Sequence, residues 1–405
     1  MNNIPSIVLI REEKIPSDAR VVLTPQQCQH LRSQGYDISV QSSSVRAYKD
    51  DEYKALDIPV VEQIHDFDIF IGVKEVPISN LIPQKTYFFF SHTIKEQPYN
   101  RNLLKTAIER QIRLIDYEVI TNDKGQRLIA FGKFAGMVGA HNGLWTYGQR
   151  TGAFEMPRMY QSKDYASVQE YYSRLKLPAA KVVLTGTGRV ANGAAMVLED
   201  MGIKKVRPLE FLLNSFDFPV FTQLNSFYYV ARKDGRVVED IRDFFNNPSE
   251  YESIFSPFIK TADIFINGIY WDNDAPAFFR IQDTASDEFN VKVIADVTCD
   301  IAPVSSIPST LRASTIQDPV FGFDPLTGKE CAPFSSSLDM MTIDNLPNEL
   351  PRDASEAFGE MFIEHVLPEL DKSESSLLDR ATICKMGKLT EKFKYLRNYV
   401  EAESL

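Results

Sequence analysis

The sequence is poor in cysteine, and this excludes two kinds of site. Its 405 residues include four cysteines, Cys28, Cys299, Cys331 and Cys384. They lie far apart, form no CxxC pair and do not adjoin histidines at metal-ligand spacing. Neither a disulfide framework nor a zinc site is therefore indicated, and we expect no bound metal.

Excess positive charge and long apolar runs are also missing. The formal net charge of −11 argues against nucleic acid as the main partner. No apolar run approaches the roughly 20 residues that span a bilayer, so no membrane partner is expected. The first expected strand begins near residue 7 and leads into charged residues at 11–13, unlike a secretory signal. These features favour a cytoplasmic protein.

What the sequence does contain is the composition of an ordinary globular protein. Hydrophobic residues make up 44% and charged residues 24% of the chain. A chain of 405 residues exceeds what one core usually serves, so two domains are expected.

A dinucleotide fingerprint lies near the middle of the chain. Residues 181–202 read KVVLTGTGRVANGAAMVLEDMG, an apolar strand, a glycine-rich turn and a helical pattern. Gly186 permits the tight turn and Gly188 lets the backbone approach a pyrophosphate, which faces the N–H groups of the helix. Ala191 or Gly193 keeps the helix close to the strand. The predicted cofactor-binding residues here are Gly186, Thr187, Gly188, Arg189 and Val190.

Apolar runs alternate with helix-compatible segments on both sides of this fingerprint. SIVLI, YDISV, DIFIGV, TYFFFSH and RLIDYE precede it, and FYYVAR, ADIFINGIYW and VKVIADVTCD follow it. This alternation predicts an α/β protein with two Rossmann-like, doubly wound parallel-sheet domains and a substrate cleft between them. We assign residues 1–139 and 344–405 to the substrate domain and residues 140–343 to the nucleotide domain.

Smaller features refine this outline. Thr24 and Pro25 suit a helix start, and Gly35 suits its end. Residues 301–337 are rich in Pro, Ser and Thr and are expected to form a long loop. A helical pattern follows near residue 357, with Asp353 or Ser355 as its cap. We expect this tail to return to the first domain.

Titratable residues follow three strands predicted in the first domain. Lys74 and Glu75 come after DIFIGV, His92 after KTYFFFS and Glu118 after RLIDY. Taken singly, each is more often a solvated or packed residue, but ligands of open α/β sheets collect beyond the carboxyl ends of the strands. In a partly desolvated crevice, Lys74 and His92 suit proton transfer to and from an amine and an imine. Glu118 suits a substrate ammonium.

For the other candidate residues, the sequence allows two alternative roles. Arg20 is either a surface charge or a binder of a substrate carboxylate. Asp296 ends a strand and either lines the nicotinamide or is only solvated. The second strand of the nucleotide domain should end near VRPLEF, where Glu210 would favour NAD and Arg207 would favour NADP. The cofactor is therefore NAD(P)H, with the choice between NAD and NADP open.

A series of motifs carries a family resemblance along nearly the whole chain. These motifs are REEK, DARVVLTP, IGVKE, KTYFFFSHTIK, IRLIDYE, AFGKFAGMVGA, TGTGRVANGAA, FINGIYW and IDNLPNELPRDASEAFGEM. The chain resembles the family of lysine-ketoglutarate reductases and lysine-forming saccharopine dehydrogenases. More widely, it resembles alanine dehydrogenase and the nucleotide-binding part of transhydrogenase.

The resemblance implies a reaction and roles for the site residues. Lysine and 2-oxoglutarate would condense to an imine that accepts hydride from NAD(P)H and gives saccharopine, or the reverse. Lys74 and His92 would be the acid–base pair, and Arg20 would bind a substrate carboxylate. Glu75 and Glu118 would tune these groups or hold an amine.

The resemblance also concerns Asp344 and the segment after Cys299. The resemblance places Asp344, in IDNLP, within hydrogen-bonding reach of the site, although its spacing alone favours a turn or cap. DVTCDIAPVSS departs from the related reductases after Cys299, which leaves the substrate open. The alternatives are an amino-acid dehydrogenase of the alanine dehydrogenase type and a nucleotide-binding protein without catalysis.

Overall fold

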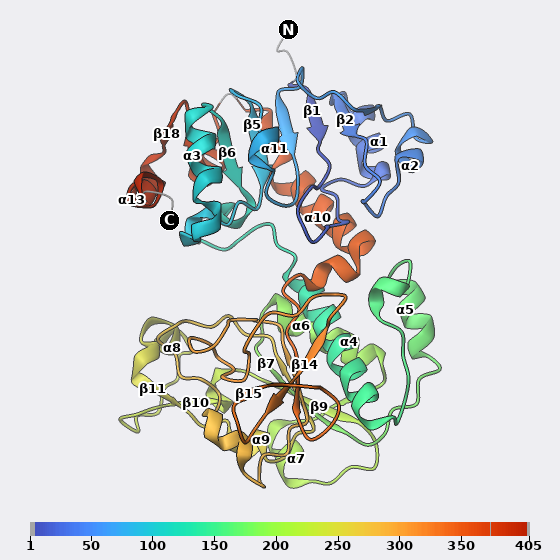
Figure 1. Ribbon diagram of the computed structural model, residues 1–405, viewed down its shortest axis with the longest axis vertical. Helices are drawn as coiled ribbons and strands as arrows, with labels where there is room; N and C mark the ends of the chain where they lie inside the picture. Colours follow the sequence, from blue (N-terminus) through green and yellow to red (C-terminus); the bar gives the residue numbers. More distant parts are fainter. Residues whose placement is uncertain (1–4, 373, 403–405) are drawn as a thin grey trace. The chain divides into compact units, whose positions relative to one another are not determined.

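The structure is a computed structural model that describes residues 5–372 and 374–402. It divides into two compact units, Met1–Ala130 with Pro351–Leu405, and Phe131–Leu350. Each unit contains an eight-stranded sheet, mostly parallel, and several helices (Figure 1). The predicted α/β class is confirmed. The assignment of the units to substrate and nucleotide stays a prediction.

In the first unit, the sheet has the order β18-β17-β6-β5-β4-β1-β2-β3. Its parallel strands are β1 (Ile7–Leu9), β2 (Ile38–Gln41), β3 (Val60–Val61), β4 (Ile69–Ile71), β5 (Thr86–Phe89) and β6 (Arg113–Asp116). The antiparallel strands β17 (Thr382–Lys385) and β18 (Lys388–Leu389) extend the sheet from β6. The tail of the chain therefore joins the sheet that begins near the N-terminus.

The helices of the first unit follow from local signals. They are α1 (Pro25–Ser33), α2 (Asp50–Lys54), α3 (Arg101–Glu109), α10 (Pro351–His365), α11 (Leu367–Leu370), α12 (Ser376–Ala381) and α13 (Arg397–Glu401). The predicted start of α1 is confirmed, because the Thr24 hydroxyl accepts the N–H of Gln27, whose side chain accepts the N–H of Thr24. Gly35 has φ +99°, as a helix terminator requires.

Helix α10 covers part of the first sheet with aromatic side chains. Phe358 packs edge-on against Tyr117, with ring centroids 5.1 Å apart, and Phe362 packs edge-on against Phe88. The prediction that Asp353 or Ser355 caps this helix is wrong, because α10 begins at Pro351. The Ser355 hydroxyl instead accepts the N–H of Val21, which ties the tail helix to the N-terminal segment.

The second unit has the sheet order β15-β14-β16-β13-β12-β7-β9-β8. Its parallel strands are β7 (Lys181–Thr185), β8 (Lys204–Lys205), β9 (Val220–Leu224), β12 (Ile264–Asn267), β13 (Val293–Asp296) and β16 (Leu338–Met341). The antiparallel strands are β14 (Val320–Asp324) and β15 (Lys329–Cys331). These two lie within residues 301–337, so the predicted long loop is partly wrong. Both strands are short and are flanked by turn residues, which hid their apolar pattern.

The remaining elements of the second unit surround this sheet. They are α4 (Gly132–Thr151), α5 (Tyr165–Tyr172), α6 (Arg189–Asp200), α7 (Pro208–Leu213), α8 (Arg242–Asn246), α9 (Ser256–Ile259) and the strand pair β10 (Val230–Arg232) and β11 (Tyr251–Ser253).

Within residues 5–372 and 374–402, none of the helices is long and apolar enough to cross a membrane. The same residues contain no group of three His, Cys, Asp or Glu side chains placed to hold a metal ion.

Helices α4 and α6 approach closely because glycines face their contact. A Cβ atom on Gly136 would lie 1.8 Å from the Val190 carbonyl oxygen, and one on Gly193 would lie 2.1 Å from that of Lys133. Gly193 therefore serves the packing of α6 against α4. Ala191 faces the strands instead, since a Cβ atom on Gly268, just after β12, would lie 3.2 Å from its Cα atom. Of the two residues predicted to keep the helix close to the strand, Ala191 is therefore the one that faces the strands.

Candidate active site

In the first unit, three neighbouring parallel strands deliver the predicted titratable residues to one edge. Lys74 and Glu75 follow β4, His92 follows β5 and Glu118 follows β6. Because parallel strands end at the same side of a sheet, their following residues lie at the same edge. Strand β1 flanks β4 on the other side and brings the segment from Ile10 to Arg20 to this edge.

Glu75 and His92 form a close pair there. The Glu75 Oε1 atom lies 2.6 Å from His92 Nδ1, and its Oε2 atom lies 3.0 Å from the Lys14 Nζ atom. Burial acts to raise the pKa of Glu75, but the hydrogen bond and charge of His92, with Lys14, outweigh it and bring the pKa to about 2. Glu75 is therefore ionised at neutral pH and orients the imidazole.

The backbone at His92 is itself unusual. Its φ of +52° lies in the left-handed region, which is uncommon for residues other than glycine. The residue forms the N-cap of a short 3₁₀ turn at Thr93–Lys95, and its ring lies nearly parallel to that of Phe90. The contact with Glu75 and the packing against Phe90 together restrict the orientation of the imidazole, and therefore the direction of its Nε2 atom.

Lys74 is half-buried beside a group of charges. Burial, followed by the nearby charges of Arg20 and Lys14, lowers its pKa to about 8, against the opposing effect of Asp18 and Glu75. A lysine with such a pKa exists as the neutral amine in a useful fraction near neutral pH. The predicted movement of its pKa toward neutrality agrees with this value.

Arg20 differs from the exposed cation that its sequence position suggests. Its side chain is 3% exposed, and its Nε atom donates to the Asp18 Oδ1 atom at 2.9 Å. Asp18 is buried as well, so the two residues form an interior ion pair. Neither Asp18 nor Glu12 was singled out from the sequence. The only available signal was their position in REEKIPSDAR, between a strand end and a candidate arginine.

The two carboxylate oxygens of Glu118 have different surroundings. Its Oε1 atom lies 2.7 Å from the Arg127 Nη2 atom, and the Lys95 ammonium is 3.9 Å away. Its Oε2 atom is buried and has no hydrogen-bond partner among the described residues. An unsatisfied buried carboxylate oxygen is costly, and a ligand that donates a hydrogen bond would relieve this cost.

The glycine turn lies in the second unit between β7 and α6. Gly186 has φ +102°, and a Cβ atom there would lie 2.7 Å from the Gly268 carbonyl oxygen, so glycine is required. Gly188 is exposed, and a Cβ atom on it would meet nothing within 4 Å. Thr187 and Arg189 are exposed and Val190 is half-buried. The first N–H groups of α6 and the open space at Gly188 fit a pyrophosphate.

Asp296 ends β13 in the interior of the second unit. Its carboxylate accepts hydrogen bonds from Asn267 Nδ2 at 3.0 Å and from the Thr310 hydroxyl at 2.7 Å. Burial raises its pKa to about 6, although both hydrogen bonds act to lower it. Asn267 also accepts the hydroxyl of Thr185, so the network joins the ends of β7, β12 and β13. This network accounts for the buried carboxylate, and its contact with a cofactor stays a prediction.

The strand order changes the surroundings expected for the nucleotide ribose. The short strand β8 lies at the sheet edge, and β9 takes the place beside β7. Glu210 lies on α7, where its Oε2 atom accepts the N–H of Arg207 at 3.0 Å. The strand that adjoins the glycine turn ends at Leu224 and continues into Asn225. The ribose contacts expected of Glu210 and Arg207 stay predictions.

Gln223 on β9 was not recognised from the sequence. Its amide nitrogen donates to the Gly186 carbonyl at 3.0 Å and to Asn192 Oδ1 at 3.1 Å. Its amide oxygen accepts from the Lys205 ammonium at 2.7 Å. Lys205 is thereby held next to the glycine turn through one intervening side chain. Because β9 follows β7 by 35 residues of varied pattern, local signals did not show this contact.

Asp344 and Cys299 lie in the second unit, on segments that follow β16 and β13. Asp344 is exposed. Burial, with the charges of Asp296 and Asp344, raises the pKa of the Cys299 thiol, whose Sγ atom is 3.1 Å from the Thr342 carbonyl oxygen. Lys74, Glu75, His92, Arg20 and Glu118, by contrast, belong to the first unit.

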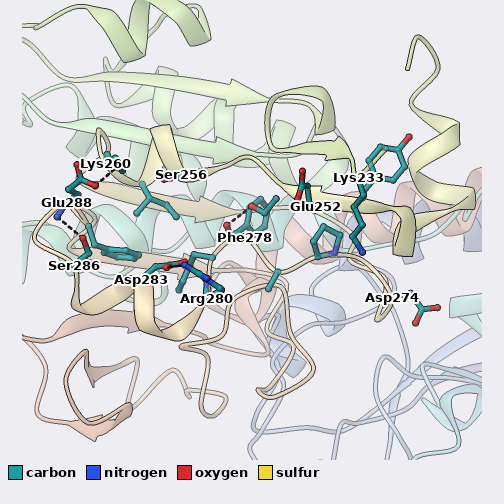
Figure 2. A pocket seen from close by; sticks show the side chains of 17 residues that line it. Lys233, Glu252, Ser256, Lys260, Asp274, Phe278, Arg280, Asp283, Ser286 and Glu288 are labelled. Atoms are coloured by element: carbon teal, nitrogen blue, oxygen red, sulfur yellow. Dashed lines mark hydrogen bonds and ion pairs between the residues drawn. The ribbon is translucent and has the colours of Figure 1, made fainter. Parts of the chain in front are cut away.

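The second unit also contains a hollow of about 720 Å³ that holds none of the predicted residues. Figure 2 shows charged side chains along its lining, four of which form two ion pairs. The Lys260 ammonium lies 2.6 Å from Glu288, and Arg280 lies 2.9 Å from Asp283. Volume alone does not indicate a ligand here, and we assign this hollow no role.

Comparisons with known proteins find related dehydrogenases and semialdehyde synthases. Residues 9–138 match the model of the alanine dehydrogenase/PNT N-terminal domain. The alpha-aminoadipic semialdehyde synthase of Mus musculus is 31% identical over 98% of this chain and 48% of its own length. The NAD(+)-dependent, L-lysine-forming saccharopine dehydrogenase of Emericella nidulans is 27% identical over 92% of this chain and 95% of its own.

Solved structures show the same fold. L-alanine dehydrogenase superposes with a TM-score of 0.67 at 15% identity, covering 97% of this chain and 98% of its own. The transhydrogenase from Sinorhizobium meliloti gives a TM-score of 0.58 at 12% identity, covering 95% of this chain and 99% of its own. The chain spans about half the length of the semialdehyde synthases that it matches. The chain is thus similar over most of its length to saccharopine dehydrogenases and alpha-aminoadipic semialdehyde synthases, and its residues 9–138 match the alanine dehydrogenase/PNT N-terminal domain.

Proposed function

We propose that the chain is an NAD(P)-dependent oxidoreductase of the saccharopine type. It joins the ε-amine of L-lysine to 2-oxoglutarate and gives saccharopine, or catalyses the reverse. The observation that carries this proposal is the cluster of Lys74, Glu75 and His92 in a chain that also contains a dinucleotide turn. Similarity to saccharopine dehydrogenases supports the choice of substrates.

The chemistry requires proton transfers that these side chains suit. The lysine substrate must lose a proton before its amine adds to the keto carbon, and the carbinolamine must gain one as water leaves. Neutral Lys74 accepts a proton, and the His92 Nε2 atom exchanges another while Glu75 holds Nδ1. When bound, the reduced nicotinamide supplies the hydride that adds to the imine carbon, so that the C=N bond becomes the C–N bond of an amine.

The remaining predicted residues receive binding roles. Glu118, through its unsatisfied Oε2 atom, accepts a substrate ammonium. Arg20, whose guanidinium also pairs with Asp18, orients a substrate carboxylate. Asp344 hydrogen-bonds the substrate or nicotinamide from the segment after β16.

The turn from Gly186 to Val190 holds the pyrophosphate. The backbone N–H groups at the start of α6 face it, and the absence of a side chain at Gly188 gives it room. We infer that the choice between NAD and NADP is made where β9 ends. A carboxylate that would accept ribose hydroxyls is missing from the described residues at 223–226, while Lys205 is fixed beside Gln223. This arrangement favours the 2′-phosphate of NADP.

Substrate assays test this function. The protein is incubated with NADPH or NADH and with either lysine plus 2-oxoglutarate or pyruvate plus ammonium, and cofactor absorbance is followed. We expect turnover with lysine and 2-oxoglutarate. Turnover with pyruvate and ammonium alone would indicate the alanine dehydrogenase type, which the fold also accommodates. Binding of both cofactors without turnover of either pair would indicate a non-catalytic protein.

A further inference from the structure

Glu12 links the first strand of the sheet to the segment that carries Lys74. It follows β1, and Lys74 follows the neighbouring parallel strand β4. Its Oε1 atom accepts the N–H of Val73 at 2.6 Å, and its Oε2 atom accepts the N–H of Lys74 at 2.9 Å. A single carboxylate thus satisfies two consecutive backbone donors where the ladder of the sheet has ended.

The same carboxylate lies among the charges that surround Lys74. Burial and the charge of Asp18 raise the pKa of Glu12 to about 8, while the two backbone N–H groups and Arg20 act to lower it. Arg20 and Asp18 also shift the pKa of Lys74, in opposite directions. The buried Tyr117 hydroxyl, whose pKa is raised by burial and then by Glu12, has no hydrogen-bond partner among the described residues. Glu12, Asp18, Arg20, Lys74 and Tyr117 therefore share one electrostatic environment.

We propose that Glu12 is a positioning residue for Lys74, which fixes the backbone that carries this lysine through its two hydrogen bonds. Its effect on catalysis rests on the function proposed above. Two features make this arrangement more than a strand-end contact. It uses both oxygens of one side chain, and it connects Lys74 to a residue 62 positions earlier. A loss of this contact would move the amine and change its affinity for a proton.

Three variants test the position of the Glu12 side chain. Glu12→Gln replaces one of the two acceptor oxygens with an NH₂ group. Glu12→Asp keeps both oxygens but shortens the reach by one methylene. Glu13→Gln is the matched control, because Glu13 is the adjacent, more exposed carboxylate and contacts Arg11 and Asn80 instead.

The expected results differ between the variants. Glu12→Gln should lower kcat roughly 10- to 100-fold, with the KM for NADPH within about twofold, because a small misplacement of a reacting group has effects of this size. The pH–kcat profile of Glu12→Gln should shift, because the Lys74 amine would move relative to Arg20, Asp18 and Glu75, whose charges affect its pKa. Glu12→Asp should also lower kcat, because its carboxylate no longer reaches both N–H groups. Glu13→Gln should match the wild type.

The proposal would be overturned if Glu12→Gln lost stability but kept the same kcat and pH profile as the control Glu13→Gln. The titration of Lys74 provides a readout that does not depend on turnover. It is followed by NMR in the full chain labelled with ¹³C-lysine, with Lys74→Arg used to assign the signal. A shifted Lys74 pKa in Glu12→Gln supports the proposal even if wild-type protein fails to reduce the imine, an outcome that would refute only the proposed function. An unchanged Lys74 pKa overturns the proposal in either case.

Discussion

At the residue scale, Glu75 is the side chain that organises the candidate active site. It binds the His92 ring and the Lys14 ammonium with separate oxygens, at 2.6 and 3.0 Å, while only 12% of its side chain is exposed. A carboxylate in this position has two effects. It contributes to folding stability as an ionised group, and it determines which imidazole nitrogen remains for proton exchange.

The pKa of Glu75 predicts a pH dependence of stability. Its pKa is about 2 in the folded chain and 4.5 ordinarily, so its ionised form stabilises the fold fully above pH 4.5. This contribution, on the order of 3 kcal/mol at most from the size of the shift, is lost as the pH falls from about 4.5 toward 2. The unfolding free energy of the wild type should therefore fall more than that of Glu75→Gln between pH 6 and pH 3. Urea denaturation of both proteins at each pH measures this, and parallel losses would contradict it.

Part of this site could be predicted from the sequence. Lys74, Glu75 and His92 stood out because each follows an apolar strand directly. Glu12 did not stand out, because its significance depends on the pairing of β1 with β4 across about 60 residues. The burial of Arg20 with Asp18 was also hidden, since a charged residue before a helix is ordinarily exposed.

At the element scale, the contact of α4 with α6 depends on two glycines. Alanine normally stabilises a helix relative to glycine by up to about 1 kcal/mol. At Gly136, alanine should instead lower stability. The added Cβ atom would lie 1.8 Å from the Val190 carbonyl oxygen, which is part of the backbone and cannot move away freely.

Gly136→Ala should therefore destabilise the second unit by roughly 1–3 kcal/mol, the usual cost of overpacking, or more. Gly132→Ala, on the same helix, is the control, because its Cβ atom would meet side chains at the ordinary distance of 3.4 Å. Chemical denaturation compares the two variants. Equal stability of both would show that the α4–α6 contact is looser than described.

The order of the strands carries a prediction about cofactor choice. Lys205 contacts Gln223 beside the glycine turn, whereas the neighbouring Lys204 ammonium lies over the Phe218 ring, 5.4 Å from its centroid. Lys205→Ala should weaken NADPH binding roughly tenfold and NADH binding little, because only NADPH carries the 2′-phosphate. Lys204→Ala should change neither. Fluorescence titration with both cofactors measures the affinities, and an equal effect of Lys205→Ala on NADPH and NADH would contradict the inferred position of the 2′-phosphate.

Elements with local signals were predictable, and their long-range order was not. The start of α1 and the turn between β7 and α6 follow from residues close together in the sequence. The insertion of β9 between β7 and β8 depends on pairing between distant segments, and β8 has only two residues. The strands β14 and β15 were missed because a short antiparallel pair in a segment rich in Pro, Ser and Thr resembles a loop.

At the scale of the whole molecule, the predicted acid–base residues and the dinucleotide turn belong to different compact units. Apolar periodicity and the glycine fingerprint predicted two α/β domains, and the motif series indicated the similarity to saccharopine dehydrogenases. The unit that each end of the chain joins could only be guessed from sequence, because β17 pairs with β6 across more than 250 residues.

This separation predicts that chemistry and cofactor binding can be lost independently. Lys74→Met or His92→Gln should lower kcat by roughly 100- to 10,000-fold, the usual contribution of general acid–base catalysis. Cofactor affinity should stay within a few-fold, because these residues lie outside the unit that contains the glycine turn. Steady-state kinetics and cofactor titration together test this. A comparable loss of cofactor binding in either variant would contradict the assignment of roles to the two units.

In the proposed reaction, hydride passes from the reduced nicotinamide to an imine formed from lysine and 2-oxoglutarate. The most direct measurement uses reduced nicotinamide deuterated at C4 on the transferred face, with mass spectrometry of the product. The proposed function predicts saccharopine that carries one deuterium on the carbon derived from the ketone, at a rate greatly reduced by Lys74→Met. Deuterated alanine from pyruvate and ammonium, without saccharopine under any condition, would contradict it.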